Sequence, residues 1–379
     1  MRILHSYLFF SIKFAGGTSD LMFKILKIQS KTSDPVLLTG DYKFDANLFN
    51  QLNKVSIIKT RSFFDGLGLS IMPGLPLALW SNRHKFDYVH MHIYRTFQSA
   101  ILFIYCTIFK IPYVIDAHGA VPYHSKKIKL KKLFDFILGR AMLRRARWLV
   151  AETDVGAAEY LQIEPNLDRK KIRILSPPFD TSEYLDLPAA GDFRKKFGID
   201  SNKKLVAFLG RLHECKGNDF LIRAFASLLE KRTDIHLALI GPDDGHEQLL
   251  RALVEELDIY DHVTFTGFVG GREKNEALGE TDIVVQLSRF EQGAWAPIEG
   301  VLCGKPIIVT SHTGAGEDVR RLNAGYLVDF DRNDQFCERC NYILDNYGEA
   351  KARTMRARDF IIQNLSMDAR VGEYYGLFS

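Results

Sequence analysis

The stretch IVVQLSRFEQGAWAPIEGVLCGKPIIVTS, residues 283–311, contains two short apolar runs separated by a turn and a helix-like segment. The runs IVVQLS and PIIVTS are rich in β-branched residues, which favour strands. Pro297 is tolerated only near the start of a helix, so it places a helix N-terminus at about Ala296. Two strands joined by one helix are typical of a parallel βαβ unit.

The same alternation continues in both directions along the chain. The other short apolar runs are RILHSYLF, PVLLTG, VSIIKT, YVHMHI, PYVIDAHG, WLVAET, KLVAFLGRL, IHLALIG and VTFTGFV, with longer amphipathic segments between them. A chain of 379 residues is also too long for one compact core. We therefore predict an α/β protein with two doubly wound parallel sheets that face each other across a cleft, where ligands of such folds usually bind.

Composition sets the expected domain boundaries. Residues 176–192, SPPFDTSEYLDLPAAGD, are rich in Pro, Asp and Ser and are typical of a linker. We expect an N-terminal Rossmann-like domain over residues 1–180 and a C-terminal Rossmann-like domain over residues 192–360. Residues 361–379 are expected to form a final helix, for which packing back on the N-terminal domain is one option.

Charge, cysteine content and hydropathy exclude several classes of protein. The net charge is +4, but residues 126–147 alone contain nine Lys or Arg and one Asp, so the basic charge is local rather than spread over a nucleic-acid-binding surface. Five scattered Cys, an odd number, argue against a disulfide framework and favour the cytoplasm. The longest apolar segment, residues 97–109, is shorter than the ~20 residues of a membrane-spanning helix.

Two glutamates flank the turn in the opening stretch. Glu291 lies just before the predicted helix, and Glu299 lies in its first turns. A carboxylate accepts hydrogen bonds from two adjacent hydroxyls, whereas backbone N–H groups at a helix N-terminus bind phosphate. A nucleotide sugar, two polyols joined by a diphosphate, matches this order, with Gly293, Ala294 and Trp295 supplying the backbone groups. The alternative is that both glutamates only stabilise the helix dipole.

A second loop of the same domain carries two cations. The predicted strand KLVAFLG is followed by Arg211 and Lys216 in GRLHECKG. Their cationic groups suit the oxygens of a diphosphate. A solvated loop that happens to hold two basic residues is the alternative. The presence of both glutamates further along the chain favours the nucleotide-sugar interpretation.

Four segments together resemble the retaining glycosyltransferases of family 4, which have the GT-B fold. These segments are FLGRLHECKG, EQGAWAPIE followed by GVLCGKPIIVTSHTGAGE, FAGGTSDL near the N-terminus, and VIDAHGA. The resemblance spans nearly the whole chain. It implies that His118, Glu291, Arg211 and Lys216 take part in the reaction.

The resemblance also implies a role for each remaining site residue. Arg211 and Lys216 would bind the diphosphate, and Glu291 would bind the donor sugar together with the backbone of Gly293, Ala294 and Trp295. Glu299 would bind the ribose, and Phe268 and Val269 would line the base. Gly16 and Gly17 would approach the phosphate and the acceptor, and His118 would contact the transferred sugar. Many members of the family carry Gly-Phe-Gly after the first glutamate, whereas this chain has bulky Trp295 in that region, which reshapes the sugar pocket.

Several candidate metal ligands lack partners in the sequence. His90 and His92 alternate as metal ligands do on one face of a strand, but no carboxylate or Cys accompanies them. Cys337 and Cys340 have suitable spacing but no second ligand pair. His118 alone leaves a purely structural role open, because histidine is also a common polar filler. We expect no metal and no cofactor, with the nucleotide sugar as a co-substrate.

The basic segment, residues 126–147, predicts an amphipathic helix with two faces. Its expected core stripe comprises Leu130, Leu133, Phe134, Ile137, Leu138 and Ala141. The other face, expected to contact an anionic membrane or the acceptor, comprises Lys129, Lys132, Phe136, Arg140, Leu143 and Arg147. A solvated basic face without any membrane role is the alternative. No aromatic platform for nucleic acid accompanies it.

The combined hypothesis is a cytoplasmic hexosyltransferase attached peripherally to the cytoplasmic face of a membrane. By the resemblance, it retains anomeric configuration without a metal. It would move a hexose from a UDP- or GDP-sugar to a lipid-linked or glycan acceptor in polysaccharide, glycolipid or glycoprotein-glycan assembly. Two alternatives stay open: a nucleotide-sugar epimerase of the same fold, which turns over the donor without an acceptor, and a non-catalytic protein that binds sugar nucleotides.

Overall fold

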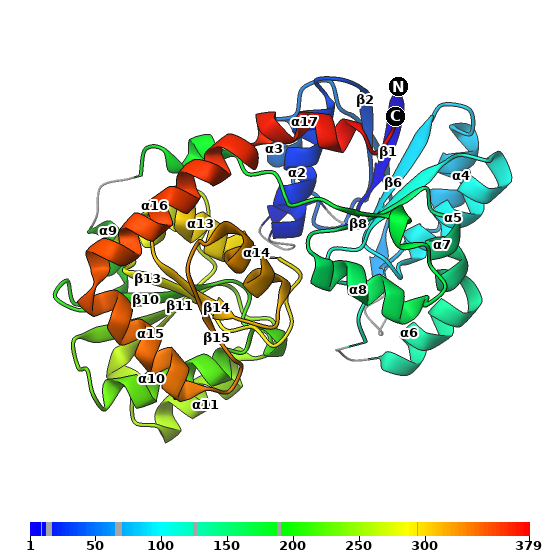
Figure 1. Ribbon diagram of the computed structural model, residues 1–379. Coiled ribbons are helices and arrows are strands. Elements are labelled where there is room, and N and C mark those ends of the chain that lie inside the picture. Colours follow the sequence, from blue (N-terminus) through cyan, green and yellow to red (C-terminus); the bar gives the residue numbers. More distant parts are fainter. Residues whose placement is uncertain (9, 13–16, 65–69, 124–126, 188–190, 294) are drawn as a thin grey trace. The chain divides into compact units, whose positions relative to one another are not determined.

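The computed structural model describes residues 1–379 except residues 9, 13–16, 65–69, 124–126, 188–190 and 294 (Figure 1). The chain forms two compact units. The first contains Met1–Phe179 and Met367–Ser379, and the second contains Asp180–Ser366. Residues 180–191, which were expected to be linker, therefore belong to the second unit.

The first unit is built on a seven-stranded parallel sheet with the strand order β3-β2-β1-β6-β7-β8-β9. The order reverses between β1 and β6, the position at which doubly wound sheets usually bind ligands. Every strand expected in this half is present, whereas the three-residue strand β9 was not predicted. The strands are β1 Arg2–Ser6, β2 Asp34–Gly40, β3 Ser56–Thr60, β6 Tyr88–His92, β7 Tyr113–Asp116, β8 Trp148–Ala151 and β9 Ile172–Ile174, with a separate antiparallel pair of β4 Phe63–Phe64 and β5 Ser70–Ile71.

The helices of the first unit include one from the C-terminal end of the chain. Helix α17 packs on α2, the first long helix, and Lys31 and Asp368 form an ion pair of 2.5 Å at this contact (Figure 1). The helices are α2 Gly17–Gln29, α3 Ala46–Phe49, α4 Leu75–Ser81, α5 Phe97–Phe109, α6 Ile128–Phe134, η1 Asp135–Gly139, α7 Arg140–Arg145, α8 Asp154–Ile163 and α17 Met367–Tyr375.

The second unit contains a six-stranded parallel sheet with the order β12-β11-β10-β13-β14-β15. Its strands are β10 Lys204–Leu209, β11 Ile235–Ile240, β12 Val263–Gly267, β13 Ile283–Gln286, β14 Ile307–Thr310 and β15 Tyr326–Val328. Its helices are α9 Asp192–Phe197, α10 Asn218–Leu229, α11 Glu247–Glu256, α12 Arg272–Glu280, α13 Trp295–Leu302, α14 Gly314–Leu322, α15 Asn333–Asp345 and α16 Tyr347–Asn364. The prediction of two parallel α/β sheets is confirmed, although the short strand β15 was not foreseen.

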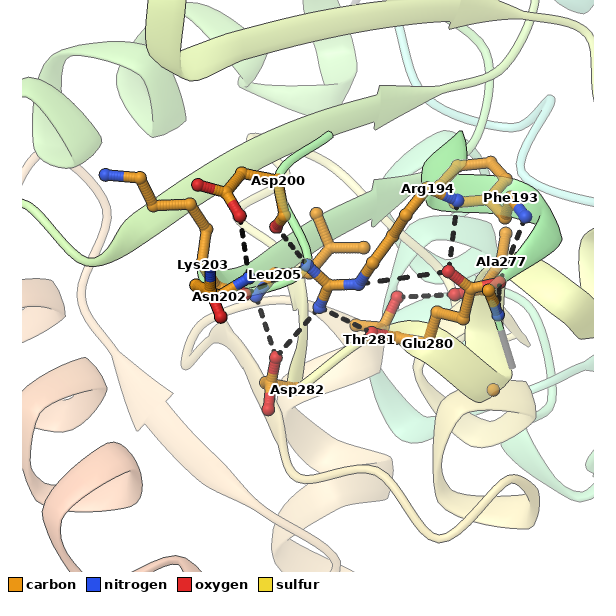
Figure 2. Close-up of polar contacts among 12 residues, drawn as sticks. Phe193, Arg194, Asp200, Asn202, Lys203, Leu205, Ala277, Glu280, Thr281 and Asp282 are labelled. Atoms are coloured by element: carbon orange, nitrogen blue, oxygen red, sulfur yellow. Dashed lines mark hydrogen bonds and ion pairs between the residues drawn. The ribbon is translucent and has the colours of Figure 1, made fainter. Parts of the chain in front are cut away.

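The chain that enters the second unit is fixed by a buried carboxylate. Glu280 accepts hydrogen bonds from the backbone N–H groups of Gly191, Phe193 and Arg194 at 2.8–3.0 Å, which satisfies the first amides of α9 (Figure 2). The Arg194 guanidinium in turn donates to the carbonyl oxygens of Asp200 and Lys203. These contacts attach the end of the expected linker region and the start of α9 to α12 and to the loop before β10.

The basic segment of the first unit differs from its predicted faces. Five residues, Asp135–Gly139, form a wider π-helical turn between α6 and α7, and the Asp135 carboxylate points inward. Leu143 is fully buried, which corrects its predicted place on the exposed face. Leu133 and Ile137, predicted to lie in the core, are 52% and 61% exposed.

The reason for this difference is a buried ion pair. The Arg95 guanidinium contacts the Asp135 carboxylate at 2.6–3.1 Å, and the hydroxyls of Tyr94 and Tyr123 donate to the same carboxylate at 2.7 and 2.6 Å. These three groups draw Asp135 toward the core, and the π-helical turn changes the helical phase by inserting a residue. The buried face therefore includes Asp135 and Gly139. Three residues of the predicted apolar stripe, Phe134, Leu138 and Ala141, do pack against the core, whereas Leu130, like Leu133 and Ile137, is exposed.

Candidate functional site

Two predicted site residues meet at the carboxyl ends of neighbouring strands in the second unit. Lys216 follows β10 in a short 3-10 turn, and Glu291 follows β13, which pairs with β10. The Lys216 ammonium contacts the Glu291 carboxylate, and their side chains are 19% and 18% exposed. Gln286 Nε2 and Ser288 Oγ also donate to this carboxylate at 2.6 and 3.3 Å. Glu291 is therefore held by three donors and still reaches solvent.

Backbone contacts explain why these two side chains come together. The N–H groups of Arg289 and Phe290 both donate to the carbonyl of Cys215, the residue before Lys216, at 2.9 and 3.3 Å. Gly217 follows with φ +63°, and a Cβ at this position would collide with the carbonyl oxygen of Leu287. Only glycine allows the two loops to approach this closely.

A bidentate ion pair supports the turn after β13. Arg289 donates to both carboxylate oxygens of Asp219 at 2.6 and 2.5 Å and to the carbonyl of Glu214 at 2.9 Å. The N–H group of Gly314, at the start of α14, donates to the Glu291 carbonyl at 2.8 Å. The loop that carries Glu291 is thus connected to the starts of two helices, α10 and α14.

Arg211 lies on the same loop as Lys216 but has a different partner. Its guanidinium contacts the Asp244 carboxylate, and both side chains are substantially exposed. Leu212 forms a backbone bridge with Asp243, which keeps the two loops adjacent. His213 caps the turn by accepting the N–H of Cys215 at 3.1 Å, and burial lowers the pKa of its imidazole. Arg211 and Lys216 therefore project from one structured loop.

Glu299, in the first turns of α13, has two partners that sequence reasoning missed. Lys274 Nζ on α12 lies 2.7 Å from Glu299 Oε1, and the Tyr184 hydroxyl donates to the same oxygen at 2.8 Å. Tyr184 comes from the expected linker, and Lys274 from a helix with no recognised motif. Neither residue had a sequence signal that could have found it.

The remaining predicted donor contacts lie at several places. Helix α13 begins at Trp295, one residue from the predicted start, and Gly293 before it is buried, whereas Ala294 lies outside the described residues. After β12, Phe268 is 43% exposed and Val269 packs in the core. In the first unit, Gly17 is the exposed first residue of α2, and Gly16 lies outside the described residues.

His118 lies in the first unit, two residues beyond β7, with a left-handed backbone of φ 45°. Its Nε2 lies 3.0 Å from His92 Nδ1, and its Nδ1 lies 3.1 Å from Asp116 Oδ1, at an angle outside hydrogen-bond geometry. Burial lowers the pKa of His118, although the Asp116 carboxylate opposes this shift, and burial raises the pKa of Asp116. Both ring nitrogens thus face other side chains of the first unit.

Sequence models of two known groups match this chain. The model described as Glycosyltransferase Family 4 matches residues 36–183, and the model described as Glycosyl transferases group 1 matches residues 190–360. The chain belongs to the family 4 glycosyltransferases. The family recognised from the sequence segments is thereby confirmed.

Curated relatives in this family match part of the chain. Mannosylfructose-phosphate synthase of Agrobacterium fabrum is 29% identical over 217 residues, which are 52% of this chain and 47% of that protein. D-inositol 3-phosphate glycosyltransferase of Mycolicibacterium smegmatis is 28% identical over 206 residues, which are 54% of this chain and 47% of that protein. The matches therefore span about half the length of these relatives.

Solved structures show the same fold over nearly the whole chain. HepE of Anabaena, crystallised in complex with UDP and glucose, has a TM-score of 0.81 and 17% identity, with 99% of this chain and 98% of that chain covered. Sucrose-phosphate synthase of Thermosynechococcus elongatus has a TM-score of 0.79 and 16% identity, with 100% and 98% covered. These likenesses confirm the predicted GT-B fold. Among the described helices, none has the length and apolar character needed to cross a bilayer.

Proposed function

We propose that the protein is a glycosyltransferase that moves a hexose from a nucleoside-diphosphate sugar, with UDP or GDP as the nucleotide, to an acceptor. The observation that carries this proposal is the meeting of Lys216 and Glu291 at the carboxyl ends of β10 and β13, with Arg211 on the same loop. Open α/β sheets bind ligands at this edge. The second unit is therefore the proposed donor-binding domain, and the first the proposed acceptor-binding domain.

The cations supply the proposed diphosphate contacts. Arg211 is paired with Asp244 at an exposed position, where ion pairs contribute only about 0–1 kcal/mol. A diphosphate can therefore replace that carboxylate at little cost, and it would join Glu291 at the less exposed Lys216 ammonium. As the glycosidic bond breaks, negative charge grows on the leaving diphosphate, and the same cations stabilise it. Glu291, oriented by Gln286 and Ser288, then accepts hydroxyls of the donor sugar.

Glu299 is the proposed ribose ligand. Lys274 and Tyr184 both contact Oε1, and their contacts hold the carboxylate in one orientation. An oriented carboxylate can accept two adjacent ribose hydroxyls without first losing side-chain freedom on binding. Exposed Phe268, after β12, is the proposed neighbour of the base, together with the backbone of Val269.

The proposed reaction retains anomeric configuration and uses the donor as a co-substrate with no metal at the donor site. The acceptor hydroxyl attacks from the face of the leaving group, and its proton passes to the departing diphosphate, so that no side-chain base is needed. Family membership supports this course. His118 is the proposed contact to the transferred sugar, and presenting a ring nitrogen requires its imidazole to turn away from His92 and Asp116. We also propose that the backbone at Gly16 and Gly17 approaches the donor phosphate closely.

The first unit carries the proposed acceptor and membrane surface. Phe136 is 81% exposed on the π-helical segment, which also carries the exposed Ile137, and exposed Leu133 lies near the end of α6. Lys129, Lys132, Arg140 and Arg147 are also exposed along this segment. Apolar side chains among cations fit the boundary of an anionic bilayer, where each cation adds about 1 kcal/mol. We propose that this surface binds the cytoplasmic face of a membrane and recruits a lipid-linked or glycan acceptor.

Relatives support a sugar-nucleotide donor. HepE of Anabaena was solved with UDP and with UDP-glucose, and one relative is named a D-inositol 3-phosphate glycosyltransferase. The mannosylfructose-phosphate synthase shows that sugar phosphates are also made by a relative. A phosphorylated or lipid-linked acceptor in glycan assembly is consistent with these names.

Product analysis tests the proposal. The protein is incubated with labelled UDP- and GDP-hexoses, with and without a total lipid extract, and the products are separated. Acceptor-dependent transfer of the label, with the α- or β-configuration kept, is the expected result. An epimerised sugar in the donor-only incubation, or donor binding without transfer to lipid or glycan acceptors, would refute it.

Vesicle sedimentation tests the membrane surface separately. The pair of replacements Lys132→Glu and Arg140→Glu should reduce binding to anionic vesicles by at least about tenfold, because each reverses a cation near the lipid. The matched control replaces two exposed cations of the second unit, Lys351→Glu and Arg356→Glu, and should bind as the wild type does. Equal loss in both variants would contradict the assignment of this surface.

A further inference from the structure

Three histidines gather inside the first unit where β1 and β6 are neighbours. His5 on β1 lies in register with His90 on β6, so the two side chains leave the sheet on the same face. His92 is two residues beyond His90 and therefore shares that face. The exposed fractions of His5, His90 and His92 are 0%, 0% and 3%. Sequence reasoning saw only the pair on β6, because His5 reaches it through the fold.

One nitrogen of each histidine lies within 4.8 Å of those of the other two. His5 Nδ1 and His92 Nε2 are 3.2 Å apart. Two nitrogens bound to one tetrahedral zinc ion at 2.0–2.1 Å lie about 3.4 Å apart. The spacing of these two atoms is thus close to that of ligands on a single ion. The His90 ring is tilted by 39° against the His92 ring with a centroid distance of 3.8 Å, and its centroid lies 5.2 Å from that of His5.

His90 has a buried imidazole without hydrogen bonds. Neither of its ring nitrogens has a partner among the described residues, and the side chain is inaccessible to solvent. Buried polar groups nearly always have partners, because leaving them unpaired is costly. A cation between His5, His90 and His92 would give His90 the missing partner.

The surrounding hydrogen bonds have the polarity that metal ligands require. Gln29 Oε1 lies 2.5 Å from His5 Nε2 and can only accept, so the proton is on Nε2 and the lone pair of His5 is on Nδ1, toward the cluster. His92 Nδ1 can donate to His118 Nε2 at 3.0 Å, which leaves the lone pair of His92 on Nε2, again toward the cluster. Asp116 Oδ1 lies 3.1 Å from His118 Nδ1, at an angle outside hydrogen-bond geometry. Such outer contacts orient metal-binding histidines in proteins.

We propose that His5, His90 and His92 bind one divalent transition-metal ion, with zinc as the ion that best suits three neutral imidazoles. All three ligands are nitrogen atoms, a donor set that zinc shares with nickel, cobalt and copper and that calcium and magnesium disfavour. The site shares no residue with the proposed donor contacts, although His92 hydrogen-bonds His118. Its role is structural, because it joins β1 to β6 at the point where the strand order reverses.

The C-terminal segment closes over the proposed ion. The Phe378 ring lies edge-on to His90 and His5, with centroid distances of 5.6 and 6.4 Å. Phe378 is itself buried and follows α17. The ion would therefore be enclosed and would exchange slowly, so the metal must be present while the chain folds. For this reason, zinc is supplied while the protein refolds in the following experiment.

Metal analysis of refolded protein tests the proposal. Tag-free protein is unfolded in denaturant with a chelator, refolded with or without zinc sulfate and desalted. Its metal content is then measured by elemental mass spectrometry. We expect one zinc ion per chain and a melting temperature higher than that of the zinc-free preparation. Cobalt in place of zinc should give the absorption of a tetrahedral nitrogen site.

Two variants make the test specific. His90→Ala removes a ligand that takes no part in the hydrogen bonds between Gln29 and Asp116, and it should abolish both the bound zinc and the zinc-dependent shift. His236→Ala, at a mostly buried histidine of the second unit that bonds Thr264, should keep both. Circular dichroism confirms that each variant is folded.

Two results would overturn the proposal. One is that wild-type protein refolded in the presence of zinc carries no metal. In that case hydrogen bonds, and no metal ion, would connect these histidines. The other is stoichiometric zinc in His90→Ala, which would place the ion in the adjacent set of His92, Asp116 and His118 instead. Neither result depends on glycosyl transfer, so the metal site and the proposed function fail separately.

Discussion

The buried carboxylate of Asp135 should be a main determinant of the stability of the first unit. Arg95 and Asp135 side chains are only 6% and 2% exposed, and the carboxylate also accepts hydrogen bonds from Tyr94 and Tyr123. Burial, followed by the Asp135 charge, raises the pKa of Tyr94, and burial also raises that of Tyr123, so both phenols stay protonated as donors. Asp135→Ala would leave the Arg95 guanidinium buried without its counter-charge.

The magnitude follows from that loss. Removing one partner of a buried ion pair costs about 3–5 kcal/mol, and two tyrosine hydroxyls lose their acceptor as well. We therefore expect Asp135→Ala to lower the unfolding free energy of the first unit by about 4 kcal/mol. Since 1 kcal/mol shifts the melting temperature of a unit of this size by roughly 2–4 °C, a decrease of about 10 °C should follow.

Urea unfolding followed by tryptophan fluorescence measures this change. The chain has three Trp, and replacing Trp295 by Phe leaves Trp80 and Trp148, both in the first unit, as the reporters. The control is Asp154→Ala, which removes an exposed pair with Arg169 and should cost less than about 1 kcal/mol. If Asp135→Ala were no more destabilising than Asp154→Ala, the buried-pair reasoning would be refuted.

Three further perturbations test other parts of the structure. Glu280→Ala removes the acceptor of three backbone N–H groups and should lower the unfolding free energy of the second unit by about 3 kcal/mol, as measured by calorimetry; a change under about 0.5 kcal/mol would contradict this. Burial lowers the pKa of His236 to about 4, so the contribution of this neutral imidazole to the unfolding free energy is complete above pH 6.5 and is lost at about 1.4 kcal/mol per pH unit as the pH falls toward 4. His236→Gln should therefore reduce the slope of the unfolding free energy against pH between pH 6.5 and 4. An unchanged slope would argue against this role. Gly217→Ala should weaken nucleotide binding at least about tenfold in a calorimetric titration, because the added Cβ displaces Lys216 from Glu291. Gly348→Ala, where an added Cβ has no atom within 4 Å, should bind the nucleotide as the wild type does.

The sequence predicted the parts of the fold that depend on local pattern. Alternating apolar runs and amphipathic segments specified the parallel strands, and Pro297 placed the start of α13 within one residue. The approach of Lys216 to Glu291 followed from two loops at the carboxyl ends of adjacent strands, β10 and β13. Short strands β9 and β15 were missed because three residues give no measurable period.

Contacts between distant segments could not be predicted in the same way. Lys274 and Tyr184 meet Glu299 from a helix and from a segment that resembled a linker, so no spacing in the sequence connects them. The predicted faces of the basic helix were wrong in part, because Phe134, Leu138 and Ala141 pack against the core but Leu133 and Ile137 do not. A buried acid, Asp135, lies on the inner face instead, and only the position of Arg95 in the fold reveals why. Hydrophobic periodicity cannot anticipate a buried ion pair.

Lys216, Glu291 and Glu299 are proposed to form a site for a nucleoside diphosphate sugar in the second unit. Calorimetric titration of UDP and of GDP into the wild type, Lys216→Met and Lys170→Met tests this site, and Lys170→Met is the control because Lys170 is an exposed cation of the first unit. We expect one nucleotide to bind the wild type and Lys170→Met equally, and to bind Lys216→Met at least about tenfold more weakly. Binding of neither nucleotide, or equal binding by all three proteins, would contradict this assignment.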